Sequence, residues 1–403
     1  MTMTAKIVLG LGFGDEGKGL VTSFLCEESL RAERKPIVIR FNGGHQAGHT
    51  VVIPGIPEVR HVFSSFCSGT LQGVPTYWSK FCTFSPLAFH SERRALLEKG
   101  CFSPVVYVHG LSPVVTPYDH LAQQRFHSLG KSNMTVGVGF GTTLQRTQDH
   151  YTLYVQDLKY PAILEEKLDA IQEYYYNRNS PISRDVLHQL LFREKCKEVL
   201  DCIEIVDDSF HDTLTKYDVI CEGAQGILLD QDFGVFPYVT RSNTTSKQAH
   251  QLGLWQNPYA VETYYVTRTY QTRHGDGFMT NLHLSEQELI RNGEETNKTN
   301  EYQGEFRRTV LDSDLINYAL DCDKHFSKGN KNLVLTCCDQ VPHFIFTSKG
   351  KQIQTIQYGD KLYQIPFEKL TEHLNTKFTR VLHSYGPTYQ HIRVPEYKKP
   401  KGL

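Results

Sequence analysis

Residues 12–19 read GFGDEGKG and lie almost at the start of this 403-residue chain. The stretch nearly matches the phosphate-binding pattern G-x-x-x-x-G-K-[ST], but Gly19 stands where that pattern has a serine or threonine. The backbone N–H groups of such a loop, the start of the following helix and Lys18 would all attract phosphate oxygens. Asp15 and Glu16 carry the opposite charge inside the same loop. The sequence therefore predicts a phosphate-binding loop that contains two acidic residues, whose negative charges would repel phosphate.

The flanks of this loop predict an α/β fold. The apolar run 7–11 precedes the loop, and Val21, Phe24, Leu25 and Leu30 follow it at helical spacing. Further short apolar runs, typical of strands buried on both faces of a parallel sheet, are residues 37–39, 105–108, 219–220, 264–266 and 333–335. We predict a large central, mostly parallel sheet flanked by helices, with a nucleotide site like that of P-loop NTPases.

The organisation of the chain favours a single body. No internal repeat or Pro/Ser-rich linker interrupts the sequence, so residues 1–403 are expected to form one α/β domain with insertions. Residues 161–205 predict two helices with a break at residues 179–181. Ser180 suits a helix cap and Pro181 suits a first helical position.

The composition limits the classes of partner. With 43 basic and 44 acidic residues the formal net charge is −1, so no overall field draws the protein to nucleic acid or to an anionic membrane. We therefore expect neither partner. The ten cysteines form no C-x-x-C pair, which argues against a disulfide framework or a structural zinc site and favours reduced thiols in the cytoplasm. The apolar run 7–11 is too short for a signal peptide or a membrane span.

Three interpretations account for the acids of the loop. In the ordinary loop the hydroxyl after the lysine binds Mg²⁺, and Gly19 has none, so Asp15 is the candidate metal ligand. Alternatively, the carboxylate of Asp15 takes a proton from a substrate. In the third interpretation, Asp15 and Glu16 only begin a helix, where the helix dipole favours acids.

Two more stretches suggest a ligand site. Residues 40–52 read RFNGGHQAGHTVV and follow a predicted strand, and His45 and His49 supply polar groups there. Residues 222–245 read EGAQGILLDQDFGVFPYVTRSNTT, again after a strand, and carry the amide of Gln225. Taken singly, each of these side chains is more simply a satisfied turn residue. Together, at strand ends where α/β folds bind ligands, they predict a shared site.

These strings resemble the adenylosuccinate synthetase family. Residues 14–19 match its GDEGKG loop, residues 43–50 its GGH-x-AGHT segment, and residues 222–245 its EGAQG-x-LLD…YPYVT-x-SNTT segment. Weaker matches follow in the family's order at residues 272–277, 307–312, 336–339 and 384–387. The resemblance thus runs over most of the chain, and its two long strings make it specific.

The resemblance implies a two-step ligase. GTP phosphorylates the 6-oxygen of IMP, and L-aspartate then displaces that phosphate to give adenylosuccinate, with Mg²⁺ as cofactor and a homodimer as the assembly. By this resemblance Asp15 is the general base at the purine N1 and binds Mg²⁺ together with the carbonyl of Gly48. His49 acts on the phosphate bridge, Lys18 neutralises charge on phosphate and O6, and Gln225 holds the 6-oxygen.

The resemblance also implies two sets of binding residues. Those expected to bind the nucleoside triphosphate and its metal are Gly14, Glu16, Gly17, Gly19, Gly48, Thr50, Asp339, Ser384 and Gly386. Those expected to bind IMP or L-aspartate are Gln46, Thr240, Arg307 and Arg308. Arg307 and Arg308 suit L-aspartate, because guanidinium groups bind carboxylates bidentately. Asp339 suits guanine, because its carboxylate can accept from the amide and the amine of that base.

Several positions depart from the family pattern around the substrate. Val136 and Val138 stand where the family has a threonine that grips the substrate phosphate and an arginine. His150 aligns with the arginine that reaches the neighbouring subunit's substrate, although Arg146 lies one helical turn away. Cys337 replaces the lysine of the guanine-reading segment. Other residues of this chain must therefore bind the substrate phosphate.

These departures keep two other functions in view. Phage relatives of the family act on dGMP, some of them with ATP. These relatives are marked by the loss of the loop aspartate, whereas this chain retains it as Asp15. A nucleotide-binding regulator without catalysis is disfavoured by the presence of Asp15, Lys18, His49 and Gln225. We favour the reaction with IMP, and we keep the same reaction with another purine monophosphate as the alternative.

Overall fold

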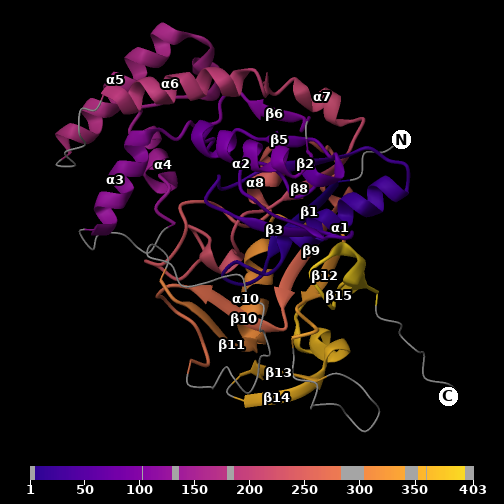
Figure 1. Ribbon diagram of the computed structural model, residues 1–403. Helices are drawn as coiled ribbons and strands as arrows, with labels where there is room; N and C mark the ends of the chain where they lie inside the picture. Colours follow the sequence, from indigo (N-terminus) through magenta and orange to yellow (C-terminus); the bar gives the residue numbers. More distant parts are fainter. Residues whose placement is uncertain are drawn as a thin grey trace, which may run out of the picture.

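The computed structural model describes residues 5–101, 103–128, 136–178, 186–282, 304–340, 353–359 and 361–394. At its centre lies a ten-stranded sheet (Figure 1). Across the sheet the order is β16 (Ile392–Arg393), β15 (Arg380–Ser384), β12 (Lys331–Thr336), β9 (Val261–Arg268), β1 (Ala5–Gly10), β8 (Asp218–Glu222), β2 (Pro36–Arg40), β5 (Thr76–Trp78), β6 (Val106–His109) and β7 (Glu204–Val206). Neighbouring strands are parallel except β15 and β16. The prediction of a large, mostly parallel sheet is confirmed.

The strands in the middle of this sheet are buried on both faces. Every residue of β1, β2 and β8 is buried. Alternate side chains enter different cores: Ile7 packs with Leu9 on one face, whereas Val8 packs with Leu25 of α1 (Lys18–Arg31) on the other. All six apolar runs quoted above form strands of this sheet. The sequence does not predict β5, β7, β15 and β16, which are short or carry few apolar residues.

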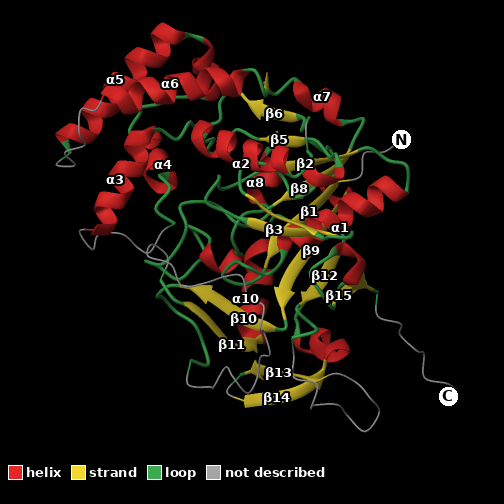
Figure 2. Ribbon diagram, viewed as in Figure 1, coloured by secondary structure: helices red, strands yellow, loops and turns green. Residues whose placement is uncertain are grey.

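Helices cover the sheet and gather at its β6–β7 end (Figure 2). The further helices are α2 (Pro86–Glu98), α3 (Pro117–Ser128), α4 (Phe140–Gln148), α5 (Pro161–Asn177), α6 (Val186–Leu200), α7 (Phe210–Leu214), α8 (Lys247–Gln251) and α10 (Ser313–Asp323). Short 3-10 helices are η1 (Thr70–Gln72), η2 (Val155–Lys159), η3 (Ile227–Leu229), η4 (Pro258–Ala260), η5 (Phe367–His373) and η6 (Tyr389–His391). The two helices predicted between residues 161 and 205 are α5 and α6. The break expected at Ser180 and Pro181 lies outside the described residues.

Two smaller sheets flank the large one. One has the order β10 (Tyr270–His274), β11 (Phe306–Asp312), β13 (Ile353–Tyr358) and β14 (Lys361–Pro366), and the other pairs β3 (His49–Ile53) with β4 (Val59–Phe63). Thr269 alone separates β9 from β10, so the chain passes directly from the large sheet into the four-stranded sheet. Because the strands are parallel, the loops after β1, β2, β8, β9 and β12 all leave at one edge. The three long stretches quoted from the sequence, residues 12–19, 40–52 and 222–245, begin at or just after the ends of β1, β2 and β8.

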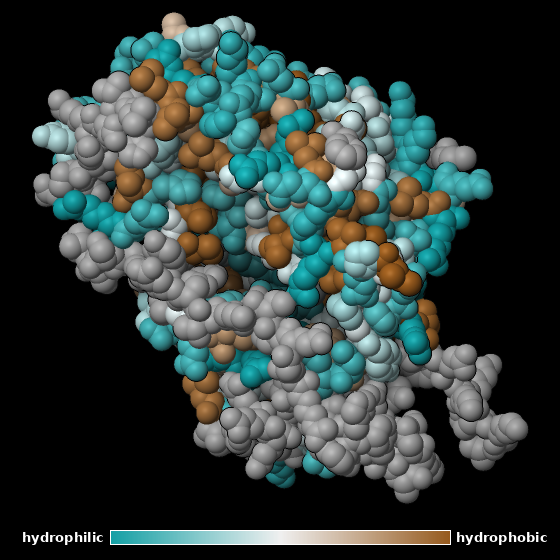
Figure 3. Space-filling view, viewed as in Figure 1, coloured by the Kyte–Doolittle hydropathy of each residue, from teal (hydrophilic) through white to brown (hydrophobic). Residues whose placement is uncertain are grey.

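Three further features concern the helices, the cysteines and the surface. Among the described residues, none of the helices combines the length and the apolar character that a membrane crossing requires. All ten cysteines are free thiols. The face in Figure 3 is mainly hydrophilic, with small separate hydrophobic areas.

Candidate active site at the carboxyl edge of the large sheet

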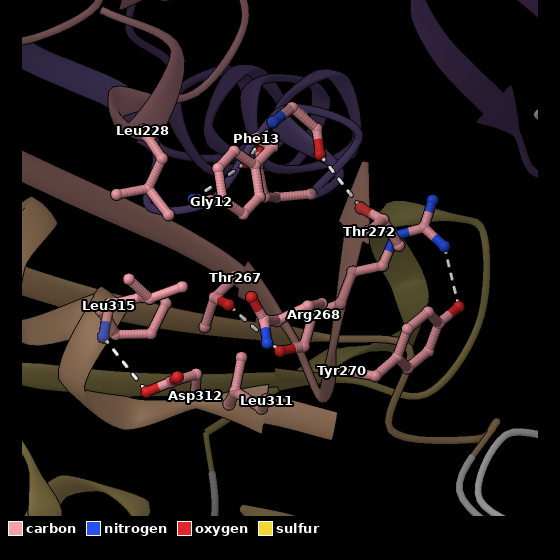
Figure 4. A pocket seen from close by; sticks show the side chains of 14 residues that line it. Gly12, Phe13, Leu228, Thr267, Arg268, Tyr270, Thr272, Leu311, Asp312 and Leu315 are labelled. Carbon is pink, nitrogen blue, oxygen red and sulfur yellow. Dashed lines mark hydrogen bonds between the residues drawn. The ribbon is translucent and has the colours of Figure 1, made fainter. Parts of the chain in front are cut away.

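The glycine-rich loop joins β1 to α1 in an unusual backbone conformation. Gly14 and Gly17 both have a φ angle of 98°, which glycine adopts at low cost. Asp15 has a φ angle of 63°, which is uncommon for a residue with a side chain. Arg268 donates to the Asp15 carbonyl oxygen at 2.6 Å. The Thr272 hydroxyl donates to the Gly14 carbonyl oxygen at 3.1 Å (Figure 4). Strands β9 and β10 therefore hold this conformation.

The amino end of α1 is open toward the loop. Gly17 is its N-cap, and no side chain of the described structure caps it. The first N–H groups of a helix have no partner inside the helix and attract anions. Lys18 begins the helix, and its side chain is buried. The loop thus has the open amides and the cation that the sequence predicts for a phosphate site.

Glu16 has a structural task within the loop. Its carboxylate accepts from the N–H groups of Gly12 at 3.0 Å and Gly14 at 2.8 Å, and pairs with the Lys18 ammonium at 2.6 Å. A side chain at Gly10 would meet this carboxylate at 2.2 Å, so glycine is required there. The second acid of the loop therefore turns inward and shapes it. Its expected part in nucleotide binding stays a prediction.

Asp15 points its carboxylate toward a residue that the sequence did not single out. Nε2 of His274 lies 3.3 Å from Oδ2 of Asp15, and about a quarter of the Asp15 side chain, 26 %, is exposed. Burial raises the pKa of Asp15, which the charges of His274, Arg268 and Lys18 oppose and that of Glu16 reinforces. A carboxyl with a raised pKa is a better base at neutral pH.

The second and third stretches are tied together by one buried asparagine. Asn42 donates to the carbonyl oxygen of Asn243 at 2.8 Å and accepts from the N–H of Ala224 at 2.8 Å. The third stretch also reaches the glycine-rich loop, because the N–H of Leu228 donates to the Gly12 carbonyl oxygen at 3.1 Å. The three stretches predicted to share a site are therefore in contact.

His49 is oriented by a carboxylate at the end of β8. Nδ1 of His49 lies 2.7 Å from Oε1 of Glu222. The same oxygen accepts from the hydroxyl of Ser68, and Oε2 of Glu222 accepts from the Ser68 N–H. Burial raises the pKa of Glu222, but His49, Arg40 and Ser68 outweigh it and lower that pKa to about 2. A carboxylate opposite Nδ1 fixes the proton there and leaves Nε2 available to a ligand. Glu222 is the first residue of the third stretch, but its role could not be predicted from the sequence, because it depends on the contact with His49.

Several buried polar atoms of these loops have no protein partner. In the described part of the chain they include Nε2 of His49, Oε1 of Gln225 and both amide atoms of Gln46. His45 precedes Gln46, and its ring has a backbone hydrogen bond to Val138. Burial lowers the pKa of His45 to about 3, so its ring is neutral. Buried polar atoms in native proteins are nearly always hydrogen-bonded to protein, water or ligand. Their concentration here indicates a site for a polar ligand.

The segments expected to read the guanine base lie beside the glycine-rich loop. The hydroxyl of Thr336, the last residue of β12, donates to the Glu16 carbonyl oxygen at 2.6 Å. The N–H of Cys338 donates to the carbonyl oxygen of Ser384 at 3.0 Å, and the hydroxyl of Ser384 donates to that of Gly386 at 2.9 Å. The loop that carries Asp339 and the loop that carries Ser384 are thus joined next to the glycine-rich loop.

The two arginines expected to bind aspartate lie on β11. Arg307 and Arg308 stand opposite Arg273 and Thr272 of β10. Arg307 donates to the Gly277 carbonyl oxygen at 3.1 Å, and its Nε is buried with no protein partner among the described residues. Because β10 also carries the contacts to the glycine-rich loop, these arginines belong to the same edge of the molecule.

The structure corrects one suggestion about the substrate phosphate. Arg146 is fully buried, pairs with Asp119 at 2.8 Å and donates to the Tyr151 carbonyl oxygen at 2.7 Å. It is therefore a structural residue and cannot stand in for the family arginine at His150, which is exposed.

Thr240, expected to bind the substrate, uses only its backbone in a contact with η3. The N–H of Thr240 donates to the Leu229 carbonyl oxygen at 2.8 Å, which leaves its hydroxyl for other partners.

The residues present fit a magnesium ion that arrives with its substrate. Asp15 supplies a partly exposed carboxylate, and Gly48, an exposed residue just before β3, supplies a backbone carbonyl. Within the described ranges, no group of three or more His, Cys, Asp and Glu side chains could hold a metal by itself. Mg²⁺ usually keeps several waters and takes one or two protein oxygens plus substrate phosphates. This donor set is of that kind.

A small cavity lies behind the glycine-rich loop (Figure 4). It is lined by Phe13, Leu228, Tyr270, Leu311 and other residues and has a volume of about 20 Å³. That is room for about one water molecule. This cavity is therefore too small for a nucleotide.

Comparison with known proteins agrees with this geometry. The family model described as adenylosuccinate synthetase matches residues 7–345. An adenylosuccinate synthetase of Marinomonas sp. (strain MWYL1) is 33 % identical over 299 residues, 68 % of this chain and 64 % of the relative. One from Buchnera aphidicola subsp. Schizaphis graminum is 32 % identical over 340 residues, 79 % and 74 % of the two chains. The match to the first of these spans less than two thirds of its length.

Two solved structures share the fold. A fully ligated adenylosuccinate synthetase from Plasmodium falciparum superimposes with a TM-score of 0.74 at 18 % identity, over 98 % of this chain and 100 % of that one. The cyanophage S-2L succinoaminodeoxyadenylate synthetase PurZ, bound to dGMP and dATP as an energy donor, gives 0.62 at 16 % identity, over 98 % and 96 %. With the matching family model and the three sequence stretches in contact at one edge, the chain belongs to the adenylosuccinate synthetase family.

Proposed function

We propose that this protein ligates L-aspartate to IMP with GTP, giving adenylosuccinate, GDP and phosphate. Family membership supports the reaction type. The observation that carries the proposal is a pair of buried atoms, Nε2 of His49 and Oε1 of Gln225, without a protein partner in the described chain. Both lie on stretches that contact the glycine-rich loop or its helix. A purine nucleotide and its phosphates supply the partners that these atoms lack.

In the first step Asp15 takes the N1 proton of the purine, and the electron pair left behind makes O6 a nucleophile. O6 bonds to the γ-phosphorus of GTP while the bond to the β-phosphate oxygen breaks and GDP leaves. Lys18 and the open amides of α1 offset the phosphate charge, and Nε2 of His49 is available to the phosphate bridge because Glu222 occupies Nδ1. A magnesium ion bound by Asp15 and the Gly48 carbonyl would add positive charge to the phosphates.

In the second step the amino group of L-aspartate attacks C6, and the phosphate on O6 leaves. Arg307 and Arg308 on β11 bind the carboxylates of the amino acid. Gln225 holds the 6-oxygen by donating from its amide nitrogen. Asp339 and the loop of Ser384 bind the guanine of GTP, as their position beside the glycine-rich loop allows.

A second candidate substrate is another purine monophosphate such as dGMP, with ATP or GTP as donor. Two observations favour it. Val136 and Val138 precede α4 where the family grips the IMP phosphate, so the substrate contacts differ here. The structural relative PurZ, which is similar in fold, is bound to dGMP and dATP. The presence of Asp15, in contrast, favours the IMP reaction.

We also propose a cytoplasmic homodimer. The ten free thiols suit a reducing compartment. Family likeness supports the dimer, which sedimentation at several protein concentrations tests.

A substrate panel tests the proposed function. The purified protein is incubated with Mg²⁺, L-aspartate, GTP or ATP, and IMP or dGMP in each combination, and the succino-nucleotide is detected by mass. Product from IMP with GTP supports the main proposal, and product from dGMP alone supports the second candidate. Binding of a triphosphate without product from any combination would point to a regulator and reject both.

A further inference from the structure

The Asp15 carboxylate has one close side-chain partner among the described residues. Oδ2 of Asp15 lies 3.3 Å from Nε2 of His274 at the end of β10. The backbone of Asp15, in contrast, is fixed by other groups, since Arg268 donates to its carbonyl oxygen at 2.6 Å and Thr272 donates to that of Gly14 at 3.1 Å. The loop backbone would therefore keep its shape without His274, but the carboxylate would lose its partner.

The ring of His274 is itself held in place. It packs against the ring of Phe306 with the centroids 4.8 Å apart, and 16 % of its side chain is exposed. Phe306 precedes Arg307 on β11, so the strand expected to bind the amino acid also supports this histidine. Nδ1 of His274 is buried and has no protein partner in the described chain. Nε2 is therefore the ring nitrogen that faces the Asp15 carboxylate.

We infer that His274 is a positioning residue that fixes the rotation of the Asp15 carboxylate and directs its other oxygen toward the purine N1. The inference rests on the proposed function, because it takes Asp15 as the base. A carboxylate that turns freely spends most of its time in orientations from which it cannot take the proton. Misplacement of a reacting group by about 1 Å can cost on the order of 10²-fold in rate. His274 should therefore affect kcat and leave substrate binding nearly unchanged.

Kinetics of matched variants test this role. His274→Ala should lower kcat by about 10- to 100-fold, with the KM values for the triphosphate and the purine monophosphate changed by less than about threefold. His274→Gln should recover much of the loss, because its amide nitrogen can take the place of Nε2 beside the same oxygen. His90→Ala is the control: Nδ1 of His90 lies 3.0 Å from Glu198 on helices remote from the loop, so kcat should not change. A loss confined to KM, or no rescue by glutamine, would overturn the inference.

A readout without turnover separates this inference from the proposed function. Crystal structures of the unliganded wild type and of His274→Ala are compared at the loop. We expect the same backbone over residues 12–17 and a displaced Asp15 carboxylate. An Asp15 carboxylate that keeps its place in His274→Ala would reject the positioning role, whether or not the wild type turns over any substrate. Failure of the wild type in the substrate panel would instead reject the proposed function.

Discussion

Nδ1 of His49 lies 2.7 Å from the carboxylate of Glu222, and both side chains are buried. The contact determines which ring nitrogen faces the site, because Nδ1–H donates to Glu222 and Nε2 is left without a protein partner in the described structure. The histidine is the first residue of β3, and the carboxylate is the last residue of β8. Parallel neighbouring strands thus bring a reactive group and its orienting group to the same edge.

Glu222→Gln should lower kcat while nucleotide binding is retained. The amide can donate to Nδ1 and favour the wrong tautomer of His49, so we expect a loss of at least about 10-fold. Steady-state kinetics measure kcat, and calorimetry measures triphosphate affinity. Glu92→Gln is the matched control, since Glu92 contacts His61 at 3.3 Å in a buried pair of α2 and β4. Equal kcat in wild type and Glu222→Gln would contradict the assigned orientation.

Glu222 should also make stability depend on acid pH. Its folded pKa is lowered from 4.5 to about 2, so its ionised form contributes stability above pH 4.5, and this contribution is lost as the pH falls toward 2. Urea unfolding of wild type and Glu222→Gln is measured at several pH values between about 5 and 2.5. The free energy of unfolding should fall more steeply in the wild type. Parallel pH profiles would show that this carboxylate is not the group responsible.

Glu16→Gln should destabilise the glycine-rich loop. The glutamine cannot accept from both Gly12 and Gly14 while pairing with the Lys18 ammonium, so a buried cation loses its partner. We expect the free energy of unfolding to drop by about 1–3 kcal/mol, and triphosphate affinity to fall with it. Glu27→Gln removes the exposed ion pair with Arg31 and serves as control, with an expected change below about 0.5 kcal/mol. A Glu16→Gln protein as stable as that control would show that the inward contacts do not hold the loop.

Arg307→Lys should impair use of L-aspartate specifically. Lysine keeps the charge but cannot bind a carboxylate bidentately, so the KM for L-aspartate should rise by about 10- to 100-fold. The KM values for GTP and IMP should stay within about threefold of the wild type. Arg94→Lys, at an exposed position of α2, is the control. An unchanged KM for L-aspartate would remove Arg307 from the amino-acid site.

Much of the fold follows from local sequence patterns, and part of the site does not. Strand, glycine loop and helix are consecutive in the chain, so residues 5–31 could be predicted as one unit, and apolar runs identify the strands buried on both faces. His274 could not be found this way, because its contact joins residues far apart in the sequence. The burial of Arg146 against Asp119 is likewise a tertiary contact. Helical spacing alone suggested, wrongly, that Arg146 could replace the family arginine that aligns with His150.

The role of Asp15 is tested most directly by Asp15→Asn, assayed with the substrate pair that the wild type uses. The amide keeps the size of the side chain but cannot take the N1 proton, so a loss of about 10²- to 10⁴-fold in succino-nucleotide formation is expected. Calorimetry should show that the variant still binds the purine monophosphate and the triphosphate. Turnover equal to the wild type, measured on the same protein preparation, would contradict the assignment of Asp15 as the base.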